Sequence, residues 1–103
     1  MKSQRHLQHI RNQPCALCAS NPEECSGSVQ AHHLMKPWLG YRGTGMKAGD
    51  ENAIPLCFEH HRDLHAVGNE ANFFKLKGLS ENYGKALAYG LWLRSPYFKE
   101  KEK

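Results

Sequence analysis

The first regular pattern of apolar positions lies near the N-terminus, where Leu7 and Ile10 are three residues apart. This spacing places both side chains on one face of a helix, so we expect a short helix over residues 4–12. Pro14 should end it, because the residue before a proline is disfavoured in helical conformation.

The middle of the chain predicts two strands. Residues 28–35 (SVQAHHLM) read as a strand, and the short apolar segment 53–56 (AIPL) reads as a second strand that pairs with the first. Residues 15–27 are rich in turn formers and predict a compact knuckle. Residues 36–50 hold four glycines and one proline and predict a long loop.

Three helices should follow the second strand. Residues 58–66 predict a helix closed by Gly68, and EANFFKLK predicts a helix capped by Asn69 and stopped at Gly78. The segment ENYGKALAYGLWLR predicts a last helix capped by Ser80. Its apolar residues recur at steps of three and four, which is typical of core packing.

The length of the chain, 103 residues, predicts a single domain with a core over about residues 5–95 and a solvated tail at 96–103. The apolar fraction is 40% and the mean hydropathy is −0.70, which predicts a thin core. Thin cores of this size are often stabilised by a metal ion or by disulfides. The chain has four cysteines that could serve either purpose.

The N-terminal residues lack the apolar segment of a secretory signal, and no apolar run is long enough to span a bilayer. We therefore expect a cytoplasmic protein without a membrane partner, in which clustered cysteines bind metal rather than form disulfides. The formal net charge of +4 suits a polyanionic partner such as DNA.

Two short cysteine and histidine motifs predict a structural zinc site. Cys15 and Cys18 form a CxxC pair, and Cys57 and His60 have the same spacing further along the chain. Together they would complete a tetrahedral Cys₃His site. Cys25 lies in the same knuckle and is an alternative to His60 as the fourth ligand.

The remaining histidines predict a second site. On a helix His61 and His65 project from one face, because they are four residues apart, and His60 lies about 100° around from His61. His60 can therefore serve one ion while His61 and His65 serve another. His32 and His33 are adjacent on the first strand and point to opposite sides, so one can ligate while the other faces a substrate.

The order of these motifs resembles the HNH (His-Me finger, ββα-metal) endonucleases. CALC, then AHHL, then a glycine-rich loop, then NAIPLCFEHHRDLH is similar to small phage and prophage proteins of the recombination-enhancement nuclease type. The resemblance implies an α+β fold: a zinc-stabilised ββα-metal hairpin and helix with a zinc knuckle, an N-terminal helix and C-terminal helices.

The resemblance also implies roles for individual residues. It places the general base at His33 and the residue that orients this base at Asn52. Its catalytic ion falls on His32, His61 and His65. Its structural zinc falls on Cys15, Cys18, Cys57 and His60, with Cys25 as the extra thiol.

The function implied is metal-dependent hydrolysis of phosphodiester bonds in DNA. The catalytic ion would be Zn²⁺, Mn²⁺, Ni²⁺ or Mg²⁺, and an all-imidazole site favours the transition metals over Mg²⁺. A recombination protein is a further expected partner. The DNA contacts are expected from the loop and from the second helix, at Lys36, Trp38, Arg42, Lys47 and Arg62.

Two other functions fit part of the pattern. One is a non-catalytic zinc module of the same fold that binds DNA or a recombination protein. The other is a metal-storage or sensing protein, which would account for the histidines but not for the spacing from Asn52 to Cys57. Asp50, just before this segment, could support the loop or the active site, and the sequence leaves that choice open.

Overall fold

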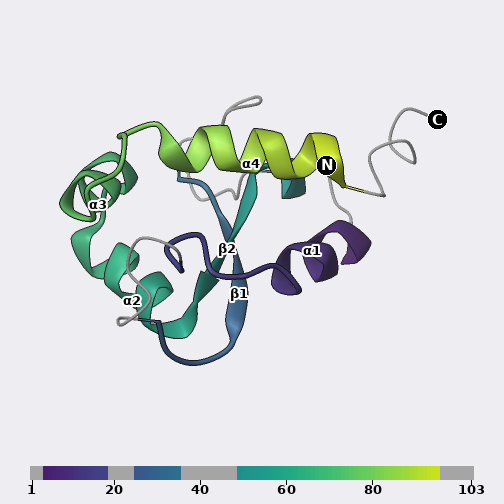
Figure 1. The fold of residues 1–103 in the computed structure, drawn as a ribbon, viewed down its shortest axis with the longest axis horizontal. Coiled ribbons are helices and arrows are strands. Elements are labelled where there is room, and N and C mark those ends of the chain that lie inside the picture. Colours follow the sequence, from purple (N-terminus) through teal and green to yellow (C-terminus); the bar gives the residue numbers. More distant parts are fainter. Residues whose placement is uncertain (1–3, 19–24, 36–48, 96–103) are drawn as a thin grey trace.

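The computed structural model describes residues 4–18, 25–35 and 49–95. Within these ranges the chain is α+β, with a two-stranded sheet and four α-helices (Figure 1). The elements are α1 (Gln4–Arg11), β1 (Val29–His33), β2 (Ala53–Cys57), α2 (Phe58–Val67), α3 (Glu70–Leu76) and α4 (Tyr83–Arg94), with a 3₁₀ turn at Asp50–Asn52. No described helix has the length and apolar character needed to cross a membrane.

Strands β1 and β2 pair in the antiparallel direction, as the sequence predicted. The register sets His32 opposite Ile54 and His33 opposite Ala53. The two histidines therefore lie at the end of β1 that faces the start of β2. Residues 36–48, most of the expected long loop, lie outside the described part of the chain.

Helix α2 follows β2 without a connecting loop. Cys57 is the last residue of β2 and also caps α2, and its sulfur accepts a hydrogen bond from His60 N at 3.4 Å. The helix ends at Gly68, whose φ of 77° lies in the left-handed region that glycine adopts without steric cost. Both ends agree with the sequence prediction.

Helices α3 and α4 differ in how well their starts were predicted. Asn69 caps α3 as expected, with its side-chain oxygen accepting from Asn72 N at 3.0 Å. The prediction that Ser80 caps α4 is wrong, because α4 begins only at Tyr83 with Asn82 in the cap position. Ser80 Oγ instead accepts from Asn82 N at 3.2 Å, in a turn that precedes the helix.

All five residues of β2 are buried, because helices cover both of its sides. Figure 1 shows the hairpin between α1 on one side and α2 with α3 on the other, with α4 across its end. Ile54 and Leu56 belong to the larger apolar cluster, which includes Leu64, Phe73 and Phe74. A second cluster joins α1, β2 and α4 and contains Leu7, Ile10, Ala53 and Leu91.

A buried histidine connects the first helix of the chain, α1, with the last one, α4. His6 of α1 is fully buried; its Nδ1 lies 3.0 Å from Ser95 Oγ, and its ring packs edge-on against Trp92 of α4. Burial lowers the pKa of His6 to about 4; the nearby His9 adds to this effect, and Asp50 opposes it. The folded protein therefore disfavours the protonated imidazole.

We expect this histidine to make folding stability sensitive to acid. In the unfolded chain His6 binds a proton near pH 6.5, whereas in the folded chain it does so only near pH 4. The free energy of unfolding is therefore highest above pH 6.5 and falls as the pH drops towards 4. Between pH 7.5 and 5, the protonation of His6 should lower the free energy of unfolding by about 2 kcal/mol. Urea unfolding of wild type and His6→Phe at both pH values measures it. Equal pH dependence in the two proteins would contradict the prediction.

Candidate metal centres

Four metal-capable side chains meet beside the start of α2. They are Cys15, Cys25, Cys57 and His60, and one ligand atom from each lies within 4.8 Å of all the others. His60 Nδ1 is 3.4 Å from Cys15 Sγ, 3.6 Å from Cys25 Sγ and 3.3 Å from Cys57 Sγ. This Cys₃His cluster could hold a metal ion such as zinc.

The spacing of these atoms fits a tetrahedral zinc ion. Zinc bonds of about 2.3 Å to sulfur and 2.0–2.1 Å to nitrogen, at tetrahedral angles, place sulfur and nitrogen about 3.6 Å apart. The three distances to His60 Nδ1 lie close to this value. Zinc bound here would connect the knuckle, the end of β2 and the first turn of α2, and would contribute directly to folding.

The protonation of the thiols also fits a bound cation. Burial raises the pKa of Cys15 and raises the pKa of Cys25 to about 12. Burial has the same effect on Cys57, but hydrogen bonds from the backbone amides of His60 and Ser26 to its sulfur lower the pKa of this thiol overall. The protein therefore stabilises one thiolate by itself, and a divalent cation would stabilise the other two.

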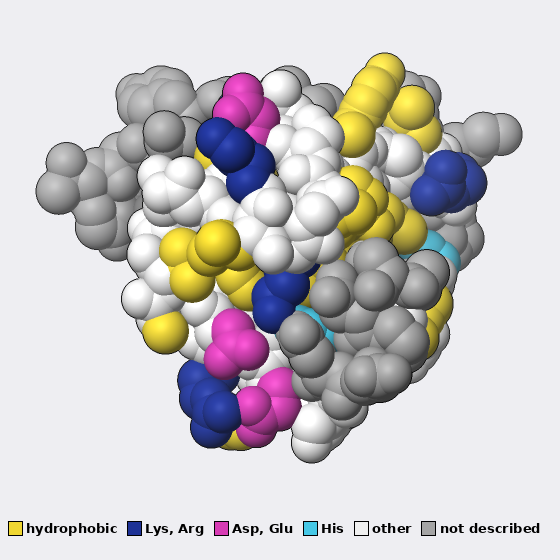
Figure 2. Space-filling view, turned by 60° about the vertical axis from the view of Figure 1, so that its left-hand side comes forward, with side chains coloured by type: hydrophobic (Ala, Val, Ile, Leu, Met, Phe, Trp, Pro, Cys, Tyr) yellow, Lys and Arg dark blue, Asp and Glu magenta, His cyan; other side chains and the backbone are white. Residues whose placement is uncertain are grey.

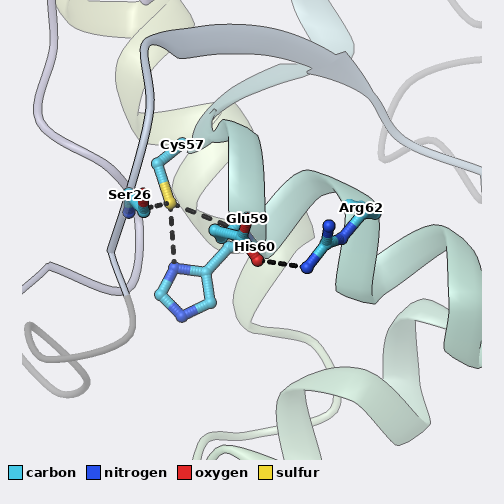
Figure 3. Close-up of polar contacts among 5 residues, drawn as sticks. All are labelled: Ser26, Cys57, Glu59, His60 and Arg62. Atoms are coloured by element: carbon cyan, nitrogen blue, oxygen red, sulfur yellow. Dashed lines mark hydrogen bonds and ion pairs between the residues drawn. The ribbon is translucent and has the colours of Figure 1, made fainter.

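The structure corrects the expected ligand set at one position. Cys18 is exposed and lies outside the cluster, although its backbone amide donates to Cys15 O at 2.9 Å. Cys25 replaces Cys18 as a candidate ligand, and His60 stays in the ligand set as expected. The sequence had offered Cys25 only as a replacement for His60. Figure 3 shows His60 Nδ1 and the amides of Ser26 and His60 converging on the Cys57 sulfur.

Three histidines form a second cluster on the other face of α2. One nitrogen each from His32, His61 and His65 lies within 4.8 Å of the others, as the sequence predicted. His61 Nε2 and His65 Nε2 are 3.1 Å apart, close to the roughly 3.3 Å expected between two nitrogens on one tetrahedral zinc ion. Burial, with His32 and His65 nearby, lowers the pKa of His61 to about 4, so this ring stays in the neutral form that binds metals.

Two residues that the sequence analysis missed contact these histidines. Gln30 Oε1 lies 2.6 Å from His61 Nδ1, so it can accept a hydrogen bond from the Nδ1–H group and leave Nε2 free to ligate. Glu70 Oε2 lies 2.6 Å from His32 Nε2 and also accepts a hydrogen bond from Met35 N at 2.8 Å. A carboxylate in contact with a metal-binding imidazole orients the ring and offsets part of the ion's charge.

His33 lies next to His32 but has a different partner. Its Nε2 is 2.8 Å from Asp50 Oδ1, and its side chain is 18% exposed, so water can reach the ring. Asn52, which the sequence placed beside this histidine, is fully buried, and its backbone oxygen accepts from Leu34 N at 3.1 Å. The orienting role of Asn52 stays a prediction, and Asp50 is the contact that the structure adds.

Of the expected DNA contacts, only Arg62 lies in the described part of the chain. Arg62 is exposed on α2; it pairs with Glu59, as Figure 3 shows, and its guanidinium lies over the Phe58 ring. Lys36, Trp38, Arg42 and Lys47 lie outside the described residues. On the face in Figure 2, the described lysine and arginine side chains are separated from one another, so they form no continuous basic patch there.

Comparisons with known proteins give one family and one relative. A family model described as "Protein of unknown function (DUF968)" matches residues 1–90. The chain is 34% identical over 62 residues to the "Uncharacterized protein YdfU" of Escherichia coli (strain K12). That match covers 60% of this chain and 16% of the relative, so the chain spans a small part of the relative's length. No solved structure gives a significant match.

Proposed function

Because the chain belongs to the family described as "Protein of unknown function (DUF968)", whose description assigns no activity, we propose a function from the site itself. The protein is a metal-dependent endonuclease that hydrolyses phosphodiester bonds in DNA. The order β1, β2, α2 then corresponds to the ββα-metal core of the HNH endonucleases. The Cys₃His cluster is its structural zinc site, and the three-histidine cluster is its catalytic metal site.

One observation carries this proposal: consecutive residues of β1 supply a ligand of a cluster able to bind a cation and a partly exposed histidine that pairs with a carboxylate. His32 belongs to the three-histidine cluster, and the next residue, His33, contacts Asp50. Hydrolysis of a phosphodiester needs both features, a positive charge near the phosphate and a base for the attacking water. A storage or sensing protein would not need a carboxylate-paired histidine next to its metal ligands.

The roles follow from these contacts. His33 takes a proton from the attacking water, and Asp50 holds its ring and stabilises the imidazolium that forms. His32, His61 and His65 hold the divalent ion, with Gln30 and Glu70 fixing two of the rings. When bound, this ion supplies Lewis-acid stabilisation of the phosphate and of the leaving oxygen.

The chemistry of the ligands favours a transition metal. Three imidazoles suit Zn²⁺, Ni²⁺ and Co²⁺, and Mn²⁺ is also compatible, whereas Mg²⁺ prefers a site built of oxygen ligands. We therefore expect activity with transition metals to exceed activity with Mg²⁺.

The proposed activity is tested by nicking of supercoiled plasmid DNA in the presence of each divalent ion separately. The expected result is conversion to open circles with at least one transition metal and no conversion after chelation. A preparation that carries zinc in the Cys₃His cluster but leaves the plasmid intact with every ion would refute the proposal. Cleavage should also weaken with added salt, because phosphate contacts by cationic side chains are screened.

Removing the carboxylate at Glu70 should weaken the second metal site. Glu70→Gln keeps the size of the side chain but loses the charge beside His32, and changes of this kind typically reduce metal affinity 10- to 100-fold. Competition titration with a chelating dye measures the affinity. Glu59→Gln is the matched control, because this carboxylate on α2 pairs with Arg62 and belongs to neither metal cluster; it should change the affinity less than twofold. Equal affinities in wild type and Glu70→Gln would contradict this role.

A further inference from the structure

A cavity of about 330 Å³ opens beside the three-histidine cluster. Its walls come from the end of β1, from the turn between α2 and α3, and from the start of α4. Glu70 lines the cavity and also contacts His32, and Leu34 lines it and directly follows His33. Through Glu70, the cavity therefore adjoins His32, one of the candidate metal ligands.

The cavity is closed on one side by tight packing between helices. Gly84 of α4 lies so close to α3 that a Cβ there would be 2.8 Å from the Phe74 ring and 3.2 Å from Leu34. Those two side chains are almost fully buried and give the cavity an apolar wall. This side of the cavity is thus set by the core of the protein.

The remaining walls are polar and mixed in charge. Asn69 and Asn82 supply amides that can both donate and accept hydrogen bonds. The charged groups in the walls are two carboxylates, Glu70 and Glu81, and one ammonium group, Lys85. This mixture of an apolar wall and a few polar groups is typical of sites for small organic ligands. A volume of about 330 Å³ is at the lower end of the roughly 300–1,000 Å³ of such sites, so it fits one nucleoside but not a stretch of strand.

We propose that this cavity is the subsite for the nucleoside next to the scissile phosphate. The inference rests on the proposed function and adds a substrate-binding site to it. The base enters between the apolar wall and the two asparagines, and Lys85 neutralises a phosphate at the mouth. The base is then held by its ring and by adaptable amides, so the subsite accepts several bases and gives weak sequence preference.

The test compares a substrate that has a nucleoside with one that lacks it. Ala71 lines the cavity, so Ala71→Phe fills it, and Lys85→Glu reverses the charge of its one lining lysine. For each protein, two rates are measured: the cleavage of a short DNA duplex, and the hydrolysis of bis(p-nitrophenyl) phosphate, a small ester that has no nucleoside. We expect kcat/KM for DNA, relative to that for the small ester, to fall at least tenfold in both variants.

Matched controls come from the same helices. Ala86→Phe on α4 and Lys75→Glu on α3 make the same changes at exposed positions that do not line the cavity. The DNA-to-ester ratio of each control should stay within twofold of wild type. An equal ratio in wild type, Ala71→Phe and Lys85→Glu would overturn the subsite, and so would an equal loss of both reactions in the two cavity variants.

A binding experiment separates the subsite from the catalytic proposal. Wild-type protein is titrated with thymidine 5′-monophosphate, and the amide resonances of Ala71 and Lys85 are followed by NMR. The expected result is a saturable shift in wild type and in Ala86→Phe but not in Ala71→Phe. Saturable binding without any DNA cleavage would support the subsite and refute the nuclease, whereas cleavage without a shift at these amides would refute the subsite alone.

Discussion

Replacing Cys57 by serine should remove the zinc ion and unfold the protein, whereas replacing Cys18 by serine should do neither. Cys57 is one of the four residues of the Cys₃His cluster, and its sulfur is 3.3 Å from His60 Nδ1. Structural zinc contributes roughly 10–16 kcal/mol in small metal-stabilised peptides. This is comparable to the net stability of about 5–15 kcal/mol that is typical of a domain, so loss of the ion should abolish folding.

The choice of serine isolates the effect of the metal. Serine is a favourable residue at a helix N-terminus, so Cys57→Ser keeps a capping oxygen for α2 while it removes a zinc ligand. Circular dichroism and zinc content of the two variants measure the difference. Retention of wild-type zinc by Cys57→Ser would contradict the cluster, and loss of zinc by Cys18→Ser would restore the ligand set expected from the CxxC motif.

Replacing His33 by alanine should reduce the rate of DNA cleavage by about 10²–10⁴-fold, the usual contribution of a positioned general base. His33 is not part of the three-histidine cluster, so the variant should bind the same number of metal ions as wild type. Single-turnover cleavage at saturating metal measures the rate. Added imidazole should restore part of the activity, because it can occupy the space left by the ring and accept the proton.

His9→Ala is the control for this prediction. His9 lies on α1, and the residues that form the two metal clusters do not include it. Its removal should leave the cleavage rate within twofold of wild type. A His33→Ala protein that cleaves DNA as fast as His9→Ala would show that another group deprotonates the water.

The sequence predicted the kinds and order of the helices and strands well, because the signals were local. The glycine after α2 and the asparagine before α3 mark helix ends by their own backbone and side-chain chemistry. The cap of α4 was placed two residues too early, since Ser80 and Asn82 are both good capping residues. Local sequence does not decide between them, and α4 packs against the 3₁₀ turn and β2, which are distant along the chain.

The ligands on α2 were predicted for the same local reason. The spacing of His60, His61 and His65 fixes their directions as soon as the segment is helical. The choice between Cys18 and Cys25 could not be made in this way. It depends on where the chain returns beside β2, which is a tertiary property that the CxxC spacing does not encode.

Gln30 and Glu70 were missed, and the role of Asp50 was left open, because each residue has an ordinary explanation in the sequence. Glu70 stands in the first turn of α3, where acidic residues are common, and it is 38 positions from His32. Asp50 and Asn52 both lie in one buried 3₁₀ turn. The conformation of that turn decides which side chain meets His33, and no sequence pattern specifies it.

The central claim is that His32, His61 and His65 bind one cation that is separate from the zinc of the Cys₃His cluster. Metal content per chain, measured by mass spectrometry after equilibration with Co²⁺ and gel filtration, tests it most directly. We predict two ions in wild type and one in His65→Ala, with the fold retained in both. One ion in both proteins, or two ions in both, would contradict the claim.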